Sequence, residues 1–266
     1  MVNIMRSYEK ILFFAVGTLA APSFAFATIF GIVGTTAASS SPKSCEKESI
    51  GDLLEKRVVD LFDEASTLPV SLTRNDGNIE VRTKFEGQHL TSLAEARVDQ
   101  PPSAFKGYLE NYNDAFAETV SMVKEIQHLE IDETDKHKRE GIKAFLQFPF
   151  PVSDRLMIHW KYLKLDRNQD EHLMMLSEDN NETLLDRFLS KKEEEKYVLA
   201  RTFLCAYWVK PIRDSKEKII GSSIKYVYSG DVGGSMPQKV QRWVAPKNAL
   251  DSIRSVIGYG KKVLKN

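Results

Sequence analysis

Cysteine is scarce in this chain, which has only Cys45 and Cys205 among its 266 residues. Two thiols cannot build a disulfide framework or a structural zinc site. Cys205 lies in the apolar run 203–207. We expect it to pack as a small buried hydrophobe, because no base that could activate it is close in the sequence. An ordinary apolar core must therefore stabilise the fold.

Net charge is absent as well, because 37 Lys and Arg residues balance 37 Asp and Glu residues. Such a chain generates no long-range field that attracts polyanions, so we expect no nucleic-acid partner. Hydrophobic residues make up 42% of the chain. Disorder along the whole chain is thereby excluded, since disordered chains combine low hydrophobicity with high net charge.

Sequence signatures of catalysis and metal binding are missing too. There is no G-x-S-x-G elbow and no glycine-rich phosphate loop. None of the histidines pairs with a second ligand type at a spacing typical of zinc sites; they are His89, His128, His137, His159 and His172. Catalytic groups can still converge from distant positions. With no positive indication of an enzyme, we expect no catalytic residues, no metal and no cofactor.

The N-terminal region is a long uncharged segment. Residues 11–41 carry no charge and follow the basic residues Arg6 and Lys10. The segment is long enough to cross a bilayer, which takes about 20 apolar residues as a helix. A basic start, an apolar stretch and small residues at Ala25 and Ala27 are typical of a cleaved secretory signal peptide.

Two alternatives to cleavage remain open for this region. Apolar character resumes at residues 29–33, which favours an uncleaved anchor, and the following Ser- and Thr-rich stretch resembles a two-part plastid presequence. We therefore predict a signal peptide or membrane anchor over residues 1–34, a linker over 35–49 and one domain over 50–266. This predicts a protein of the secretory pathway or a membrane, with a plastid as the alternative location.

Hydrophobic periodicity past residue 49 indicates a mixed α+β fold. Helical spacing occurs over residues 50–65, after Pro101-Pro102 and over about 247–264. Strand-like stretches are connected by short turns, so they should pair as antiparallel neighbours; they cover 70–73, 79–85, 92–98, 119–131, 141–150, 155–165, 172–177, 197–209 and 219–229. We predict a curved antiparallel β-sheet that grips a long C-terminal helix, because its apolar concave face needs a cover.

Three ordered motifs lie in the second half of the chain. Residues 226–239 end in Asp-Val-Gly-Gly-Ser-Met-Pro-Gln-Lys, residues 150–158 read Phe-Pro-Val-Ser-Asp-Arg-Leu-Met-Ile, and residues 198–212 carry a hydrophobic-Arg pair and a later proline. Together they resemble the START lipid-transfer domains of the helix-grip superfamily. The chain departs from that pattern at Leu156, where the family usually has Asp, and at Gln238, which lengthens the Pro–Lys spacing.

The resemblance implies a function in lipid binding. It implies that a single hydrophobic lipid occupies a tunnel between sheet and helix and that the protein transfers or senses it at membranes. Burying about 25 cal/mol per Å² of apolar surface would hold such a ligand without covalent chemistry. One alternative is an enzyme of the same superfamily that acts on a polyketide-like or aromatic substrate. Another is a membrane-tethered scaffold whose cavity is filled by side chains.

Candidate ligand contacts come first from the strand 155–165, which has two different faces. Its even-numbered face is the more apolar and by composition would face inward. The resemblance implies the opposite, because some family members place a basic residue in the cavity at the position that matches Lys161. We adopt the odd face, with Met157, His159 and Lys161 as ligand-binding candidates.

A second group of candidates lies nearer the C-terminus. Arg201 is a charge in an apolar strand and needs a partner, which is either a phosphate or carboxylate of the ligand or a structural salt bridge at the sheet rim. The remaining predicted ligand contacts are Phe203, Tyr226, Leu250, Ile253 and Ile257.

The end of the C-terminal helix combines flexibility with positive charge. Gly258 and Gly260 should weaken the helix, and Lys261, Lys262 and Lys265 make its end basic. We expect this end to rest on anionic lipid and to open there for ligand exchange. The expected partners are thus a lipid ligand and a membrane surface, and we expect the protein to be a monomer.

Overall fold

The computed structural model describes residues 49–265, apart from 75–77, 121, 134–138, 149–151, 168–169 and 180. Our predictions for residues 1–34 and for residues 35–48 of the linker lie outside the described residues. Within the described part of the chain, no helix is both long enough and apolar enough to cross a membrane.

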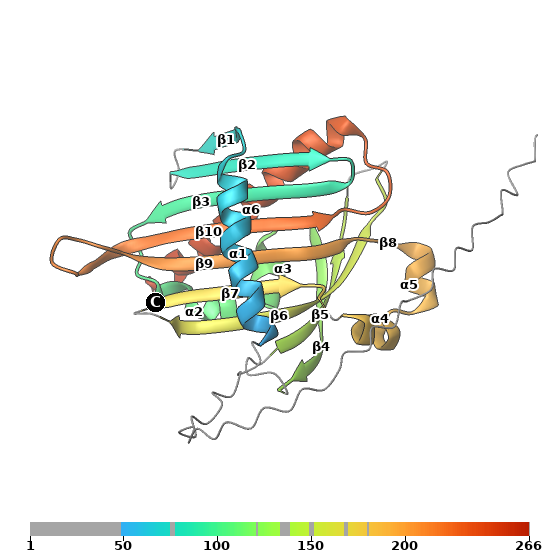
Figure 1. The fold of residues 1–266 in the computed structure, drawn as a ribbon, viewed down its shortest axis with the longest axis horizontal. Helices are drawn as coiled ribbons and strands as arrows, with labels where there is room; N and C mark the ends of the chain where they lie inside the picture. The colour runs from blue at the N-terminus through green and yellow to red at the C-terminus, as the bar shows by residue number, and fades with distance from the viewer. Residues whose placement is uncertain are drawn as a thin grey trace, which may run out of the picture. The chain divides into compact units, whose positions relative to one another are not determined.

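A strongly curved β-sheet is the centre of the fold (Figure 1). The strands are β1 (Val70–Arg74), β2 (Ile79–Glu86), β3 (His89–Val98), β4 (Val123–Asp132), β5 (Arg139–Leu146), β6 (Arg155–Arg167), β7 (Glu171–Ser177), β8 (Val198–Leu199), β9 (Arg201–Arg213) and β10 (Ile219–Asp231). The sheet order is β1-β2-β3-β10-β9-β7-β6-β5-β4, and each of these neighbouring pairs is antiparallel. The two-residue strand β8 pairs with β6 in parallel.

Helices cover both faces of the sheet. They are α1 (Ile50–Ser66), α2 (Ser103–Glu110), α3 (Tyr112–Thr119), α4 (Glu182–Phe188), α5 (Lys191–Lys196) and α6 (Gln238–Val263). Helix α1 crosses one face, and α6 runs along the opposite face (Figure 1). The predicted α+β architecture, with an antiparallel sheet gripping the C-terminal helix, is confirmed.

Helix α1 begins at a side-chain cap and packs through one apolar stripe. The hydroxyl of Ser49 accepts a hydrogen bond from the backbone N–H of Asp52 at 3.2 Å, which satisfies one of the free donors of the first turn. Leu54, Val58 and Phe62 recur every four residues and are buried against the sheet. The ring of Phe62 lies 6.0 Å from that of Trp208 on β9.

Helix α6 is longer than its sequence pattern predicts. We expected it to begin near Lys247, but it begins at Gln238, directly after Pro237, and it contains Pro246. Proline has no N–H to donate and usually interrupts a helix, which is why the sequence pattern predicts a start after Pro246. The first half of α6 also exposes Trp243, so it lacks the continuous apolar stripe of a fully packed helix.

Candidate functional site

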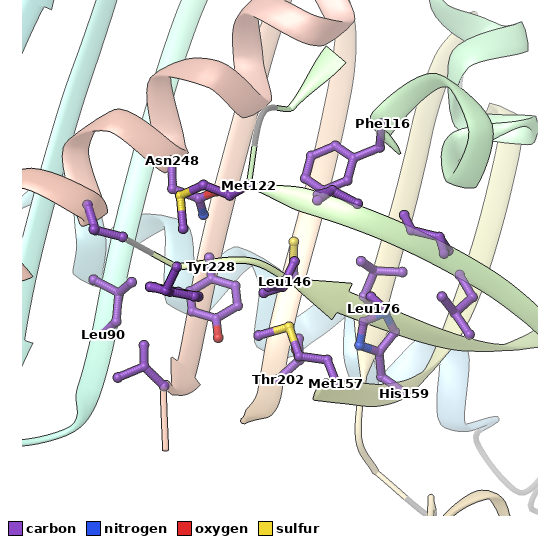
Figure 2. Close-up of a pocket in the computed structure, with 18 of the residues that line it drawn as sticks. Leu90, Phe116, Met122, Leu146, Met157, His159, Leu176, Thr202, Tyr228 and Asn248 are labelled. Atoms are coloured by element: carbon purple, nitrogen blue, oxygen red, sulfur yellow. The ribbon is translucent and has the colours of Figure 1, made fainter. Parts of the chain in front are cut away.

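A cavity lies between the concave face of the sheet and the helices α3 and α6 (Figure 2). Its volume is about 90 Å³. Most of its lining is apolar and comes from several strands and α6, including Leu90, Ile126, Ile142, Ala144, Leu176 and Val244. Three flexible methionines, Met122, Met157 and Met236, complete much of the wall.

Strand β6 contributes its odd-numbered face to this cavity. Met157 and His159 both line it, and Figure 2 shows them on the sheet side, with Asn248 on the side of α6. The even face packs on the other side of the sheet in the cluster around α1; it contributes Ile158, Trp160 and Tyr162. Two predicted contacts of β6 are therefore placed at the cavity, and their contact with a ligand stays a prediction.

His159 is the most unusual polar group of the cavity. Only 4% of the residue is exposed, and its Nδ1 atom has no hydrogen-bond partner among the described residues. Burial removes the water that would stabilise a charged ring, and this lowers the pKa of His159 to about 4. At neutral pH the cavity therefore holds a neutral imidazole, which has one N–H donor and one acceptor nitrogen.

The other polar groups of the cavity are uncharged at neutral pH as well. The hydroxyl of Thr202 donates to the sulfur of Met157 at 3.8 Å, and that of Tyr228 donates to the carbonyl of Arg201 at 3.5 Å. Burial raises the pKa of the Cys205 thiol to about 12 and raises the pKa of Tyr228 above its ordinary value. Among the described residues that line the cavity, none is Asp, Glu, Lys or Arg.

Lys161 does not line the cavity, although it lies on the same face of β6 as His159. Its ammonium group donates to the carbonyl of Glu110 at 2.9 Å and pairs with Glu140 at 2.9 Å. Glu110 is the last residue of α2, so Lys161 satisfies a free carbonyl at the C-terminus of that helix. This placement corrects the expectation of a head-group ligand, because the charge is already bound by a carboxylate and a helix end.

Arg201 and Phe203 also lie away from the cavity. Arg201 points outward with 61% of its side chain exposed, and its guanidinium donates to both carboxylate oxygens of Glu178, at 3.0 and 2.6 Å. The ring of Phe203 lies 5.4 Å from that of His89 and 5.3 Å from the Arg201 guanidinium. Arg201 thus forms the structural salt bridge at the sheet rim, which was the alternative interpretation. The interpretation of Arg201 as a charge inside the cavity is corrected.

A β-bulge explains why these two residues face outward. Leu204 pairs with Ser229 and Thr202 pairs with Gly230, so β9 has one extra residue against β10 at this point. A bulge shifts the alternation of side chains by one position. On the C-terminal side of the bulge the odd-numbered Cys205 faces the cavity, as expected. On its N-terminal side the even-numbered Thr202 faces the cavity instead.

The remaining predicted contacts divide between cavity and core. Tyr226 lines the cavity. Leu250, Ile253 and Ile257 of α6 are buried in the core cluster but do not border the cavity. Aromatic rings occupy the space under this second half of α6, with ring centroids 4.9 to 6.2 Å apart; they belong to Tyr108, Tyr112, Tyr207, Tyr226 and Tyr259. The cavity instead lies under the first half of the helix.

Several lining residues escaped the sequence analysis. Val244 and Asn248 belong to the first half of α6, and extending the predicted helix back to Pro237 would have found them. Tyr228 follows Tyr226 by two residues on β10, so strand alternation alone could have indicated it. Thr202 could not be found in this way, because the bulge is invisible in the residue pattern.

Comparison with solved structures supports the fold. The sequence matches no protein-family model and no curated protein sequence. Among solved structures, human STARD10 is similar with a TM-score of 0.60 and 11% identity, over 85% of this chain and 84% of that chain. The human StAR-related lipid transfer protein 5 has a TM-score of 0.60 and 10% identity, over 79% of this chain and 94% of that chain. A STAR-related lipid transfer protein from Xanthomonas axonopodis has a TM-score of 0.53 and 14% identity, over 73% of this chain and 98% of that chain. The chain has a START-like helix-grip fold, as its motifs predicted.

Proposed function

We propose that this domain binds a single hydrophobic lipid in its internal cavity and carries it between membranes. The observation that carries the proposal is the largely apolar cavity between the curved sheet and α6. Two structural neighbours with the same fold are named lipid transfer proteins, which supports the same ligand class for this chain. In this proposal, the apolar surface of the lipid fills space that apolar side chains would otherwise fill in the core.

The size of the cavity implies that ligand entry requires movement. Its volume of about 90 Å³ is below the roughly 300–1,000 Å³ of pockets that hold drug-sized ligands. Methionine side chains change rotamer readily, so Met122, Met157 and Met236 can yield part of the extra space. The rest has to come from outward movement of α3 or α6. A carrier needs this behaviour, because it must close in water and open at a membrane.

The chemistry of the cavity favours carriage over catalysis. A general base or nucleophile is normally held in a hydrogen bond with a second catalytic group. Among the described residues His159 has no such partner at Nδ1, and the raised pKa keeps Cys205 as a thiol. An enzyme that uses the same cavity remains the alternative, and it would require substrate to complete the catalytic arrangement.

The proposal is tested by the lipid content of the purified full-length protein. Organic extraction followed by mass spectrometry should find one lipid species enriched at about one per chain. The matched control is Ala144→Phe, which places a ring in the cavity and should lower the lipid content severalfold while the circular dichroism spectrum is unchanged. Equal lipid in both proteins, or neither bound lipid nor uptake from vesicles, would contradict lipid binding in this cavity.

Membrane docking should use the first half of α6, which lies over the cavity. Residues 232–250 contain Lys239, Arg242 and Lys247 but no acidic residue. Trp243 is 54% exposed on the same segment, and Trp is a residue type that favours the membrane–water interface. This location replaces the predicted docking end at Lys261, Lys262 and Lys265, because the aromatic core separates that end from the cavity.

Two charge-matched variants distinguish the two ends of α6. Lys239→Gln with Arg242→Gln should weaken binding to vesicles that contain phosphatidylserine by about 2 kcal/mol, which is roughly 30-fold, at about 1 kcal/mol for each basic residue near the surface. Lys261→Gln with Lys262→Gln removes the same charge at the other end and should change vesicle binding less than threefold. Vesicle co-sedimentation at low salt measures both. The reverse ranking would return the docking surface to the C-terminal end.

A further inference from the structure

The polar end of the ligand can be deduced from the groups that the cavity offers and from those it lacks. His159 lines a largely apolar cavity, and its buried Nδ1 atom has no hydrogen-bond partner among the described residues. Buried polar groups in folded proteins are nearly always hydrogen-bonded, so an orphan nitrogen inside a cavity marks a place where a ligand atom completes the bond. The ring can meet either partner type, because a neutral imidazole is a donor at one nitrogen and an acceptor at the other.

Positive charge near the cavity is already bound by protein groups. Lys161 pairs with Glu140, and Arg201 pairs with Glu178 outside the cavity. Arg155 is buried at one end of the site, behind Phe148 and Val232, and its guanidinium donates to three backbone carbonyls: those of Ser153, Val232 and Gly233. A carboxylate or phosphate brought into the cavity would lose its water without meeting a lining cation, which is unfavourable.

We infer that the ligand is a neutral lipid whose buried end carries a hydroxyl group, and that this hydroxyl hydrogen-bonds with the imidazole of His159. The inference rests on the proposed lipid-binding function and specifies its ligand class. A hydroxyl fits because it is both donor and acceptor and carries no charge into the cavity. Phe116 and Met157 then contact the hydrocarbon part, as they line the cavity on opposite sides of it (Figure 2).

Three probes with the same carbon chain separate the polar end from the hydrocarbon. Hexadecanol, hexadecanoate and hexadecane are titrated into the delipidated full-length protein at neutral pH, and each Kd is read from displacement of a fluorescent lipid. Hexadecanol should bind about tenfold more tightly than either of the other two. His159→Leu should remove the preference of hexadecanol over hexadecane, and His159→Gln, which keeps a hydrogen-bonding side chain, should retain part of it. Met175→Leu, a change of similar volume on the other face of the sheet, is the control and should leave the order unchanged.

The outcomes distinguish this inference from the function on which it rests. If none of the three probes displaces the fluorescent lipid and that lipid itself does not bind, the proposed function fails. If all three bind with equal Kd, the cavity binds lipids but His159 does not recognise a hydroxyl group, and the inference is wrong. Tightest binding of hexadecanoate would also overturn it and would point to Arg155 as the anchor of an anionic end.

Discussion

Lowering the pH from about 7 to about 5 should remove about 2 kcal/mol of folding free energy through His159 alone. The cause is its burial, which leaves the folded-state pKa at about 4 against an ordinary value of 6.5. As the pH falls below about 6.5, the ring takes up a proton in the unfolded chain but not in the folded one. The unfolded state is thus stabilised, and the folded state loses stability.

The loss has a defined pH window. It begins near the unfolded pKa of 6.5 and ends when the folded ring also protonates, near pH 4, after a total of about 3 kcal/mol. The paired carboxylates contribute at lower pH; Glu193, for example, has its pKa lowered to about 2 by the Lys143 ammonium and the Ser190 cap, which outweigh the opposing effect of desolvation. Between pH 7 and 5, the titration of histidines should therefore dominate.

Denaturant unfolding of the ligand-free protein at several pH values measures this effect. The His159→Met variant should lose about 2 kcal/mol less than the wild type between pH 7 and 5. His172, whose pKa is also lowered by burial, is present in both proteins and cancels in the comparison. Met157→Leu, a volume-conserving change on the same face, should keep the wild-type pH dependence. Equal pH slopes in wild type and His159→Met would show that the buried ring does not resist protonation.

The inward face of β6 could not be chosen from residue composition. An inward face is normally recognised because the other face is polar. Here α1 buries the even face as well, so Trp160 and Tyr162 are 2% and 0% exposed on the side away from the cavity. Both faces are buried, and composition favours the wrong one. The family resemblance favoured the face on which Met157 and His159 line the cavity, although Lys161, the residue on which that argument depended, lies outside it.

Local irregularities account for the other errors in the predicted site. A single extra residue at the β9 bulge turns Arg201 and Phe203 outward, and no residue type in the strand announces it. The antiparallel hairpins and the gripping helix, in contrast, follow from periodicity and short connections, although the pairing of β3 with β10 joins strands far apart in the sequence. The fold was therefore accessible from the sequence, while the identity of the lining residues depended on details of register.

The short helix α5 shows a signal that sequence analysis can use. The stretch that holds α4 and α5 is largely polar: α4 has one short apolar group around the buried Leu184, and α5 buries no residue, so the sequence analysis predicted neither helix. Ser190 and Glu193 nevertheless form a capping box, in which each side chain hydrogen-bonds with the other residue's backbone N–H, at 3.4 and 2.9 Å. Glu193 also pairs with the buried Lys143 at 2.6 Å. A Ser-x-x-Glu pattern in a polar region can thus identify a helix that packing does not predict.

The two glycines near the end of α6 should respond in opposite ways to the same substitution. We predicted from the sequence that alanine stabilises the helix at both positions, by roughly 0.5–1 kcal/mol each. At Gly258 a Cβ atom would have no heavy atom within 4 Å, so the full gain is expected there. At Gly260 a Cβ atom would lie 2.3 Å from Cε1 of Phe105, whose ring is fully buried and has no room to withdraw.

Gly260→Ala should therefore be less stable than Gly258→Ala by about 1–3 kcal/mol, which is the usual range for overpacking a core. Both variants gain the same helix propensity, so the difference between their free energies of unfolding isolates the clash with Phe105. Denaturant unfolding at neutral pH measures the pair directly. A second-site change, Phe105→Leu, should relieve Gly260→Ala but not improve Gly258→Ala, because only Gly260 contacts that ring. If the two alanine variants are equally stable, α6 is free to move away from α2, and its last turns can open as easily as the glycine content alone predicts.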